Sequence, residues 1–396
     1  MLYDYIIIGS GPTGLTCAHS ISKSGYTCLV IDQELSPGGC HRVDRVNGLF
    51  SEHGPRIYSS GYLNFFSLLK EHKVKSGFKP YKFTIAPSLT RKSSDNTISQ
   101  ALNVFSASEM IYLAGCYAHS IVDKKYYLSR SAQQVFGHFS KKSLNYIDKI
   151  CRLTDGAGSK RYTAYEFFQL INQNMFYEIL EPSKPNDLGW VKELVASLKK
   201  RGVDFRMDQK LTRLDKNDNG LYNVNTDTAS YDGKNIIFAT PTDTLAKFFP
   251  KFNHIDLKDY NKKSLYETYI PFTLHWNEKL KLKDIWGQGM GPWNIAWIVM
   301  SDYMNDPNTK GTMISCCISK LNTPGLNGKT VNQCDLEELK KEALSQLKPL
   351  LKDKVPRNFV MSPQVYFDTV WKNRDTAYML TPQNHNINFP FKMKNE

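Results

Sequence analysis

The segment from Tyr3 to Asp32 constrains the fold more than any other part of the chain. It opens with YDYIII at residues 3–8, an apolar, β-branched run typical of a strand buried on both faces of a parallel sheet. A helical apolar pattern follows over 15–23, and a second apolar run at 27–31 (TCLVI) ends at Asp32. This order predicts a strand, a helix and a second, parallel strand, because parallel neighbours need a crossover connection.

The turn between the first strand and the helix has a G-x-G-x-x-G pattern. Its residues that would face a ligand are Gly9, Gly11, Pro12, Thr13 and Gly14. The first glycine permits a tight turn, the second lets a pyrophosphate approach the backbone, and the third lets the helix pack close to the strand. The helix N-terminus offers N–H groups to phosphates, and Asp32 is placed to accept a hydrogen bond from a ribose hydroxyl. The unit predicts a dinucleotide-binding site, in a pattern that NAD and FAD share.

The residues after Asp32 narrow the choice of cofactor. A Gly38-Gly39 pair is followed by Arg42, and residues 51–58 read SEHGPRIY. On these motifs the chain resembles the flavin amine oxidase superfamily, whose relatives include protoporphyrinogen oxidases, carotenoid-type desaturases and, more distantly, UDP-galactopyranose mutases. In that group a Gly-Gly pair and a following arginine lie next to the FAD diphosphate. The resemblance implies FAD as the cofactor, with Gly38, Gly39 and Arg42 near its diphosphate.

The second of these motifs resembles the Gly-Pro-Arg stretch of the protoporphyrinogen oxidase branch. In the superfamily this stretch passes beside the isoalloxazine ring. The cofactor contacts that the resemblance implies are Gly54, Pro55, Arg56 and Ile57. The candidate catalytic residues are His53, Arg56 and Tyr58. Arg56 would either stabilise an anionic reduced flavin or pair with a structural carboxylate. Read without the resemblance, Gly54-Pro55 is a plain turn.

After a helical middle part, the chain returns to alternating helix and strand patterns like those of its first 32 residues. Residues 60–186 are predicted to be mostly helical, and a helix over 190–200 then precedes short strands and a buried strand at 235–240. This order also resembles the superfamily, and the resemblance would bring the backbone around Leu211 near the adenine of FAD.

A tryptophan-rich stretch in the last third of the chain has two interpretations. Trp293, Ile295 and Trp297 alternate on one face of a predicted strand. The glycines that precede them are Gly287, Gly289 and Gly291. The stretch indicates either an aromatic sheet core with a glycine turn or a loop that approaches a planar ligand closely.

These patterns predict an α/β protein with two domains. One is a Rossmann-type FAD-binding domain, a parallel sheet with helices that is discontinuous in sequence; the other is an α+β substrate domain with an antiparallel or mixed sheet and helices. The FAD-binding domain is expected at 1–75 and 187–245, and the substrate domain at 76–186 and 246–364. Residues 365–396 are expected to return toward the FAD-binding domain but lack the Gly-Asp or Gly-Gly turn and helix with which superfamily members usually close.

Composition excludes several classes of protein. Hydrophobic residues make up 41% and aromatic residues 12% of the chain, which excludes a disordered chain. Eight cysteines in 396 residues, none spaced as C-x-x-C, argue against a disulfide-stapled scaffold and against a zinc site, and we expect no metal. The net charge of +13 comes from scattered lysines and arginines without a nucleic-acid motif, so we expect no nucleic-acid partner.

The sequence shows no signal for secretion or membrane spanning. It begins directly in a predicted strand, and its apolar run at 110–118 is about half the length that a membrane span needs. We therefore expect the cytoplasm or another reducing, soluble compartment, with no signal peptide and no membrane span, while peripheral contact with a membrane stays open. Cys316 and Cys317 are expected at ordinary strand positions.

Three functions follow from these features, each with a small-molecule ligand. The first is an FAD-dependent oxidoreductase of the amine oxidase type, which transfers hydride from an amine or from an apolar CH–CH or CH–NH substrate to the flavin. The second is a UDP-sugar mutase that uses reduced FAD, favoured by a basic charge that suits a diphosphate. The third is a non-catalytic dinucleotide-binding relative, favoured by the missing C-terminal motif.

Overall fold

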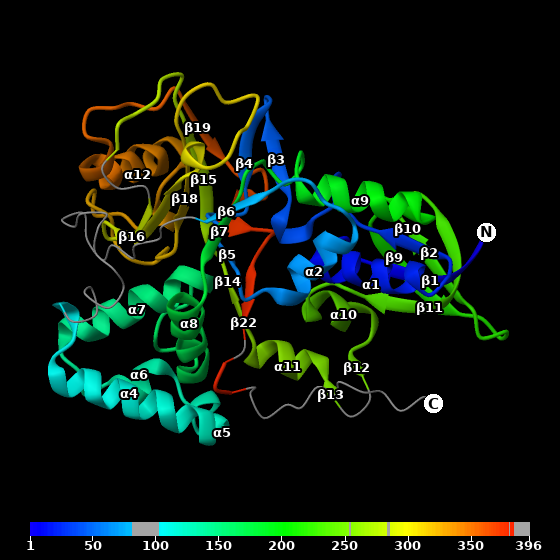
Figure 1. The fold of residues 1–396 in the computed structure, drawn as a ribbon, viewed down its shortest axis with the longest axis horizontal. Coiled ribbons are helices and arrows are strands. Elements are labelled where there is room, and N and C mark those ends of the chain that lie inside the picture. Colours follow the sequence, from blue (N-terminus) through cyan, green and yellow to red (C-terminus); the bar gives the residue numbers. More distant parts are fainter. Residues whose placement is uncertain (81–102, 253–254, 283–285, 380, 384–396) are drawn as a thin grey trace. The chain divides into compact units, whose positions relative to one another are not determined.

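The computed structural model describes residues 1–80, 103–252, 255–282, 286–379 and 381–383 (Figure 1). The chain forms two compact units, each discontinuous in sequence. Unit 1 comprises Met1–Val43, Tyr62–Lys79 and Pro182–Lys258, and unit 2 comprises Asp44–Gly61, Pro80–Glu181 and Asp259–Glu396. These boundaries differ from the expected ones at several places. Residues 76–79, 182–186 and 246–258, expected with the substrate domain, fall in unit 1. Residues 44–61 and the described part of 365–396, both expected with the cofactor domain, fall in unit 2.

Unit 1 contains a six-stranded mixed sheet. Its strands in spatial order are β8 (Val203–Arg206), β2 (Cys28–Ile31), β1 (Leu2–Ile8), β11 (Ser230–Phe238), β10 (Tyr222–Thr226) and β9 (Leu211–Lys216). The first four are parallel, and β11, β10 and β9 form an antiparallel meander. The predicted N-terminal pair is confirmed, because β1 and β2 are parallel neighbours joined through a helix.

Helices cover the parallel part of this sheet. They are α1 (Pro12–Lys23), α2 (Leu63–Glu71) and α9 (Trp190–Lys200), and Leu15, Leu69 and Leu194 from them share one core cluster with Ile7 and Val30 of the sheet. The apolar spacing of α1 and α9 predicted this packing face. Further elements wholly or partly in unit 1 include η1 (Gly39–His41), β6 (Phe78–Pro80), α10 (Thr242–Phe248), β12 (Lys251–Phe252), β13 (Ile255–Asp256) and α11 (Leu257–Lys263).

Unit 2 contains a five-stranded antiparallel sheet. Its strands in spatial order are β16 (Trp286–Met290), β17 (Ile295–Val299), β18 (Met313–Ile318), β15 (Ile270–His275) and β19 (Asn358–Met361), and the helix α12 (Leu336–Leu351) packs on it. Trp293 and Trp297 are buried in the core between them. A Cβ at Gly287 would lie 2.0 Å from the Trp297 ring, so this glycine makes room for a core tryptophan. The aromatic-core interpretation of this stretch is therefore confirmed.

A helical layer forms the other large part of unit 2 (Figure 1). Its helices are α4 (Ala107–Val122), α5 (Lys124–Leu128), α6 (Ala132–Phe136), α7 (Lys141–Asp155) and α8 (Ala164–Phe176). Phe136, Phe167 and Phe168 are buried at its centre. The predicted helical middle is confirmed for this range. The smaller elements are β3 (Val43–Val46), β4 (Leu49–Glu52), β5 (Tyr58–Ser59), β7 (Ile179–Pro182), β14 (Leu265–Glu267), η2 (Met300–Asp302), η3 (Val331–Gln333), β20 (Val365–Asp368), β21 (Val370–Asn373) and β22 (Ala377–Met379).

Two further findings bear on the sequence analysis. Among the described residues, none of the helices combines the length and the apolar character that crossing a bilayer requires. Cys316 and Cys317 both lie on β18, as expected for ordinary strand positions.

Candidate functional site

The carboxyl ends of the parallel strands in unit 1 meet at one edge of the sheet. Gly9 follows β1, Asp32 follows β2 and Ala239 follows β11, and backbone hydrogen bonds from Gly9 N to Ile31 O and from Ala239 N to Ile8 O hold the three ends together. Ligands of open parallel sheets bind in the crevice at this edge. The edge is therefore the candidate cofactor site of unit 1.

The glycines of the first turn are required by their surroundings. Gly9 has φ +105°, and a Cβ there would lie 2.7 Å from Ala239 O. A Cβ at Gly14 would lie 1.9 Å from Gly9 O, where no carbon atom fits. The strand and helix thus approach each other too closely for a side chain at either position, as the motif predicts.

The Gly38-Gly39 pair crosses directly over this turn. Gly38 N donates to Ser10 O at 3.0 Å, and a Cβ at Gly39 would lie 2.8 Å from the Cα of Gly11. Both residues of the pair have positive φ, +123° and +54°, which L side chains rarely adopt. The glycine turn and the Gly38-Gly39 pair therefore form a surface of backbone atoms without side chains. A Cβ at these positions would occupy the space that this surface leaves open. A diphosphate fits such a cradle.

The N-terminus of α1 points its free donors at the same cradle. Gly11 is the N-cap and supplies no side-chain cap, Pro12 occupies the first helical position, and the first turn contains no acidic residue. The first-turn N–H groups of Thr13 and Gly14 have no partner inside the helix. Together with the helix dipole they favour an anion at this point.

Asp32 stabilises the glycine turn after β1 and also lies at the sheet edge where a ligand would bind. Its Oδ2 accepts hydrogen bonds from Ser10 N at 2.7 Å and from Ser10 Oγ at 2.6 Å, and its Oδ1 accepts from Glu34 N at 3.0 Å. A carboxylate offers about four acceptor positions, so about one is left for a ribose hydroxyl. Asp32 lies directly after β2, as predicted, whereas Ser10 was not predicted because its role depends on a contact across the turn.

Arg42 and Leu211 lie at the periphery of this edge. The Arg42 side chain is buried, with Nη2 3.7 Å from Glu34 Oε2 and Nη1 3.4 Å from Gly39 O, so it neutralises Glu34 and braces the glycine pair. Leu211 opens β9 and packs, half-buried, against the cluster that contains Ile31 and Val224. Direct contacts of Arg42 with a diphosphate and of Leu211 with an adenine stay predictions.

In unit 2 the predicted catalytic stretch lies between β4 and β5, and β5 pairs with a strand that contains a buried glutamate. β4 ends at Glu52, and β5 begins at Tyr58 and pairs antiparallel with β7 through Tyr58–Leu180 and Ser59–Ile179. Glu181 follows Leu180 on β7. The residues between β4 and β5 are the predicted His53, Gly54, Pro55, Arg56 and Ile57. Gly54 has φ +151° and a nearest neighbour at 3.8 Å, so conformation rather than space favours glycine there.

Glu52 and Glu181 are buried carboxyl groups with unmet hydrogen-bonding capacity. Glu52 is 5% exposed and Glu181 is 0% exposed. Within the described part of the chain, strict hydrogen-bond geometry leaves Oε1 of Glu52 and both Oε atoms of Glu181 unpaired, although the Tyr303 hydroxyl lies close enough to act on Glu181. Burying an ionised carboxylate without partners is strongly unfavourable. Apart from the charge of Arg56, which acts on Glu52, the pair is stabilised either by protonation or by a positive ligand.

The electrostatics of the pair follow from its burial. Burial raises the pKa of Glu52 to about 7, against the opposing effects of the Arg56 charge and of a hydrogen bond from Ser315. Burial also raises the pKa of Glu181 well above its usual value; the charge of Glu52 adds to this, and the Tyr303 hydroxyl opposes it. Glu52 can thus exchange a proton near neutral pH.

The predicted catalytic residues surround this pair with different roles. Arg56 supplies a positive charge that acts on Glu52, and its role toward a flavin stays a prediction. His53 Nδ1 lies 3.7 Å from Asp375 Oδ2, and its ring packs edge-to-face on Tyr269. Tyr58 is 2% exposed within β5. Glu52 and Glu181 were not among the predicted site residues, although each lies beside apolar residues in a short strand, LFSE and ILEP.

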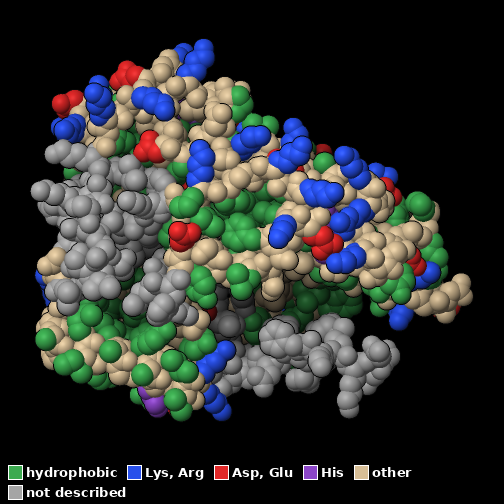
Figure 2. All heavy atoms as spheres, in the orientation of Figure 1, with side chains coloured by type: hydrophobic (Ala, Val, Ile, Leu, Met, Phe, Trp, Pro, Cys, Tyr) green, Lys and Arg blue, Asp and Glu red, His purple; other side chains and the backbone are tan. Residues whose placement is uncertain are grey.

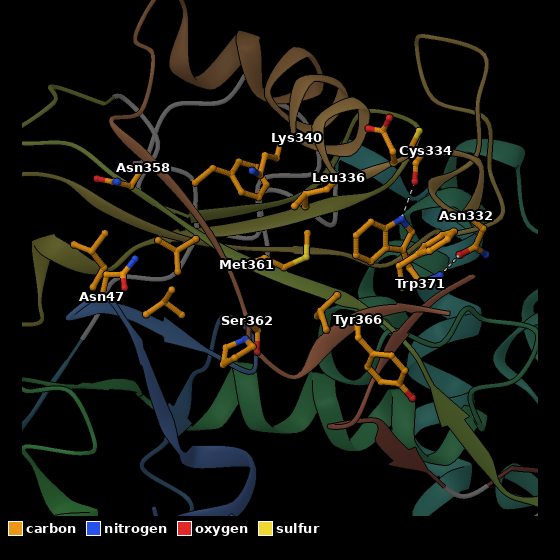
Figure 3. A pocket seen from close by; sticks show the side chains of 18 of the residues that line it. Asn47, Asn332, Cys334, Leu336, Lys340, Asn358, Met361, Ser362, Tyr366 and Trp371 are labelled. Atoms are coloured by element: carbon orange, nitrogen blue, oxygen red, sulfur yellow. Dashed lines mark hydrogen bonds between the residues drawn. The ribbon is translucent and has the colours of Figure 1, made fainter. Parts of the chain in front are cut away.

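A separate groove of about 830 Å³ lies in unit 2 between β19, η3 and the start of α12 (Figure 3). Its walls include Leu336, Met361 and Trp371. The Trp371 indole is fixed, because its Nε1–H donates to Cys334 O at 3.0 Å and its backbone N–H donates to Asn332 Oδ1 at 3.1 Å. None of the predicted site residues lines this groove.

Comparison with known proteins agrees with this architecture. Residues 7–72 match a family model described as an NAD(P)-binding Rossmann-like domain. Putrescine oxidase in a structure with bound putrescine is 15% identical, with a TM-score of 0.69 over 97% of this chain and 89% of that chain. An oxidoreductase from Methanosarcina mazei is 16% identical, with a TM-score of 0.64 over 95% and 90%. A fatty acid isomerase from P. acnes that produces CLA is 10% identical, with a TM-score of 0.62 over 96% and 88%.

The chain has the fold of these proteins. The expected fold class, a discontinuous Rossmann-type domain with an α+β domain, is confirmed, and so is the fold-level resemblance to the flavin amine oxidase superfamily. The neighbours include an oxidase and an isomerase, so one fold carries different reactions. The function of this chain must therefore be argued from its own residues.

Proposed function

We propose that this chain is an FAD-dependent oxidoreductase that oxidises an amine. The observation that carries the proposal is the buried pair Glu52 and Glu181, which lacks sufficient partners in unit 2. Unit 1 supplies the cofactor site and unit 2 supplies the side chains that bind the substrate. The two roles are separable, and each has its own test.

FAD fits the cradle of unit 1. Its diphosphate would lie on the Gly9–Gly14 turn and against Gly38-Gly39, with N–H groups of Thr13 and Gly14 toward the phosphate oxygens. The remaining acceptor position of Asp32 would take a ribose hydroxyl. When bound, FAD supplies the acceptor for the hydride. The similarity of fold to putrescine oxidase favours FAD over NAD.

An amine fits the acid pair of unit 2. An alkylammonium group has three donors and a positive charge, so it would satisfy the free oxygens of Glu52 and Glu181. The ammonium must lose a proton before its α-carbon gives up a hydride, and a carboxylate whose pKa is about 7 can accept that proton at neutral pH. The carbon that loses the hydride becomes an iminium carbon, which water hydrolyses. Putrescine, the ligand of one structural neighbour, is an amine of this class.

The acid pair argues against the UDP-sugar mutase. A diphosphate substrate would need cationic partners, whereas two buried carboxyl groups beside Arg56 repel an anion once either is ionised. The third alternative, a non-catalytic relative, predicts no flavin and no turnover.

The test is amine-dependent oxygen consumption by the flavin-loaded chain. Primary amines, putrescine among them, are supplied under air, and wild type is compared with E52Q, E181Q and the control E178Q, an exposed acid three residues before Glu181. Removing a charge-assisted contact weakens binding by roughly ten- to hundredfold, so E52Q and E181Q should lower kcat/KM by about that factor while flavin content stays constant. Turnover that E52Q and E181Q leave unchanged would refute the assigned substrate contacts, and a chain that takes up no flavin would refute the class.

A further inference from the structure

Helix α4 in unit 2 buries polar residues and exposes apolar ones. Its buried residues are Glu109, Cys116 and Ser120. Ile111 and Ile121 are each 75% exposed and Val122 is 86% exposed, the reverse of an ordinary surface helix. We call its outer stripe the α4 face. It consists of Ile111, Tyr112, Ala114, Gly115, Ala118, Ile121 and Val122, all exposed.

The orientation of α4 is fixed by the contacts of its buried acid. Glu109 accepts hydrogen bonds from Ser106 N at 2.7 Å, Ser140 N at 2.7 Å and Ser143 Oγ at 2.9 Å. Burial alone would raise the pKa of Glu109, but these hydrogen bonds outweigh it and lower the pKa to about 2. The bonds from Ser140 and Ser143 come from the start of α7, so a rotation of α4 that buried the isoleucines would break both of them. The contacts of Glu109 therefore hold the α4 face toward the solvent.

The charges around the α4 face are positive. At its C-terminal end α5 begins with the exposed Lys124 and Lys125, and the exposed Lys141 and Lys142 open α7. Between residues 103 and 142 the acids are Glu109, which is buried, and Asp123, whose side chain caps α5. Figure 2 shows hydrophobic side chains gathered over this helical layer. An apolar stripe with a basic edge is complementary to an apolar surface that carries negative charge.

We infer that the α4 face is a docking surface for an anionic lipid membrane. Helices of this kind lie in the interface with their apolar side chains among the upper acyl chains and with lysines at the headgroups. Tyr112 adds a ring with a polar end, a residue type enriched at the lipid–water boundary. At 16 residues α4 lies along the surface and does not span it. A second copy is a poorer occupant, because the chain carries a net charge of +13 and like-charged edges repel.

The first test is flotation of the full chain with lipid vesicles. Vesicles of phosphatidylglycerol and phosphatidylcholine in equal parts are compared with vesicles of phosphatidylcholine alone. The wild-type chain should bind the anionic vesicles, and I111S/I121S/V122S should bind them at least about tenfold more weakly because three exposed apolar side chains are lost. V355S is the matched control, since Val355 is 78% exposed elsewhere in unit 2, and it should bind like wild type.

A second pair of variants tests the basic edge. Each lysine near an anionic surface contributes about fivefold to binding, so K124A/K125A should weaken binding by about twenty-five-fold. Added salt should also weaken binding of the wild-type chain, because it screens this attraction. K199A/K200A, a pair of exposed lysines on α9 of unit 1, should bind within about twofold of wild type.

Three outcomes would overturn the inference. The first is that the wild-type chain does not bind anionic vesicles. The second is that the triple serine variant binds them as well as wild type. The third is that the wild-type chain is a dimer in sedimentation velocity, the triple variant is a monomer, and neither protein binds vesicles. The last result would assign the α4 face to a second copy. Circular dichroism and the melting midpoint verify the fold of each variant. If the triple variant does not fold, I121S alone replaces it and should bind about threefold more weakly than wild type. None of these readouts depends on flavin or turnover, so they stand apart from the proposed function.

Discussion

The candidate cofactor site of unit 1 is a surface of backbone, whereas the candidate substrate site of unit 2 is made of buried side chains. In unit 1 the glycine turn and the Gly38-Gly39 pair exclude a Cβ by distances of 2.8 Å or less at Gly9, Gly14 and Gly39. In unit 2, Glu52 and Glu181 meet in the interior without enough partners. The comparison shows that the close approach of backbone segments defines the first site, whereas buried carboxyl groups define the second. Different substitutions should therefore break them.

The largest effect is expected from a side chain in the cradle. In G39A a Cβ would lie 2.8 Å from the Cα of Gly11, at a φ of +54°, so FAD affinity should fall by more than about hundredfold. G25A is the matched control, because Gly25 has φ +82° but no atom within 4 Å of its would-be Cβ. Equilibrium dialysis with FAD measures both. Equal affinities for G39A and G25A would show that the close approach at Gly39 does not determine FAD binding.

Glu52 should make unit 2 less stable as pH rises from acidic to neutral values. Glu52 has a pKa of about 7 in the folded chain against an ordinary value of 4.5, so the folded state binds its proton more tightly and stability falls as pH rises from 4.5 to 7. E52Q removes this dependence and should gain up to about 3 kcal/mol at pH 8 and nothing below pH 4.5. Urea unfolding at both pH values measures the gain, with E178Q as control. A gain that is the same at both pH values would contradict the burial of an ionisable Glu52.

Unit 1 should respond to pH in the opposite direction. His72 Nε2 lies 2.8 Å from His19 Nδ1, and burial, together with the charges of Arg201 and His19, lowers the pKa of His72 to about 4. The folded state needs the neutral ring, so stability is present above pH 6.5 and is lost as pH falls toward 4. H72Q should therefore differ less from wild type at pH 5 than at pH 7 in its urea midpoint. A difference that pH does not alter would contradict this, and H138Q, an exposed histidine, is the control.

The smallest effect is expected at Ser10. Its Oγ donates to Asp32 Oδ2 at 2.6 Å, and S10A removes this bond while the backbone bond from Ser10 N remains. One net hydrogen bond contributes about 1 kcal/mol, so FAD affinity should fall about fivefold. S20A on the outer side of α1 should leave FAD affinity unchanged. Tighter binding in S10A would mean that Ser10 competes with the ribose instead of orienting Asp32.

Much of unit 1 could be predicted from the sequence because its requirements are local. Gly9, Gly11 and Gly14 stand within one turn, and the backbone conformation that they need is visible in the spacing. The resemblance implied that Gly38-Gly39 lies near a diphosphate, but the crossing of this pair over the glycine turn is a finding of the structure. Ser10 was missed because a serine between two glycines carries no pattern of its own.

Unit 2 could be predicted only in outline. The aromatic strand and the helical middle follow from periodicity, but the meeting of Glu52 with Glu181 depends on the pairing of β5 with β7, which joins segments distant in sequence. The assignment of 44–61 to unit 2 has the same cause. The α4 face was visible as an apolar run, but its exposure depends on the contacts that hold Glu109 inside.

Anaerobic mixing of the flavin-loaded chain with putrescine tests the central claim most directly. The account predicts that the visible absorbance band of oxidised flavin is lost in wild type and E178Q, because hydride leaves the amine without any need for oxygen. The band should persist in the double variant E52Q/E181Q over the same time. A band that the double variant loses as fast as wild type, across a series of primary amines, would contradict the assignment of the buried acids as the amine site.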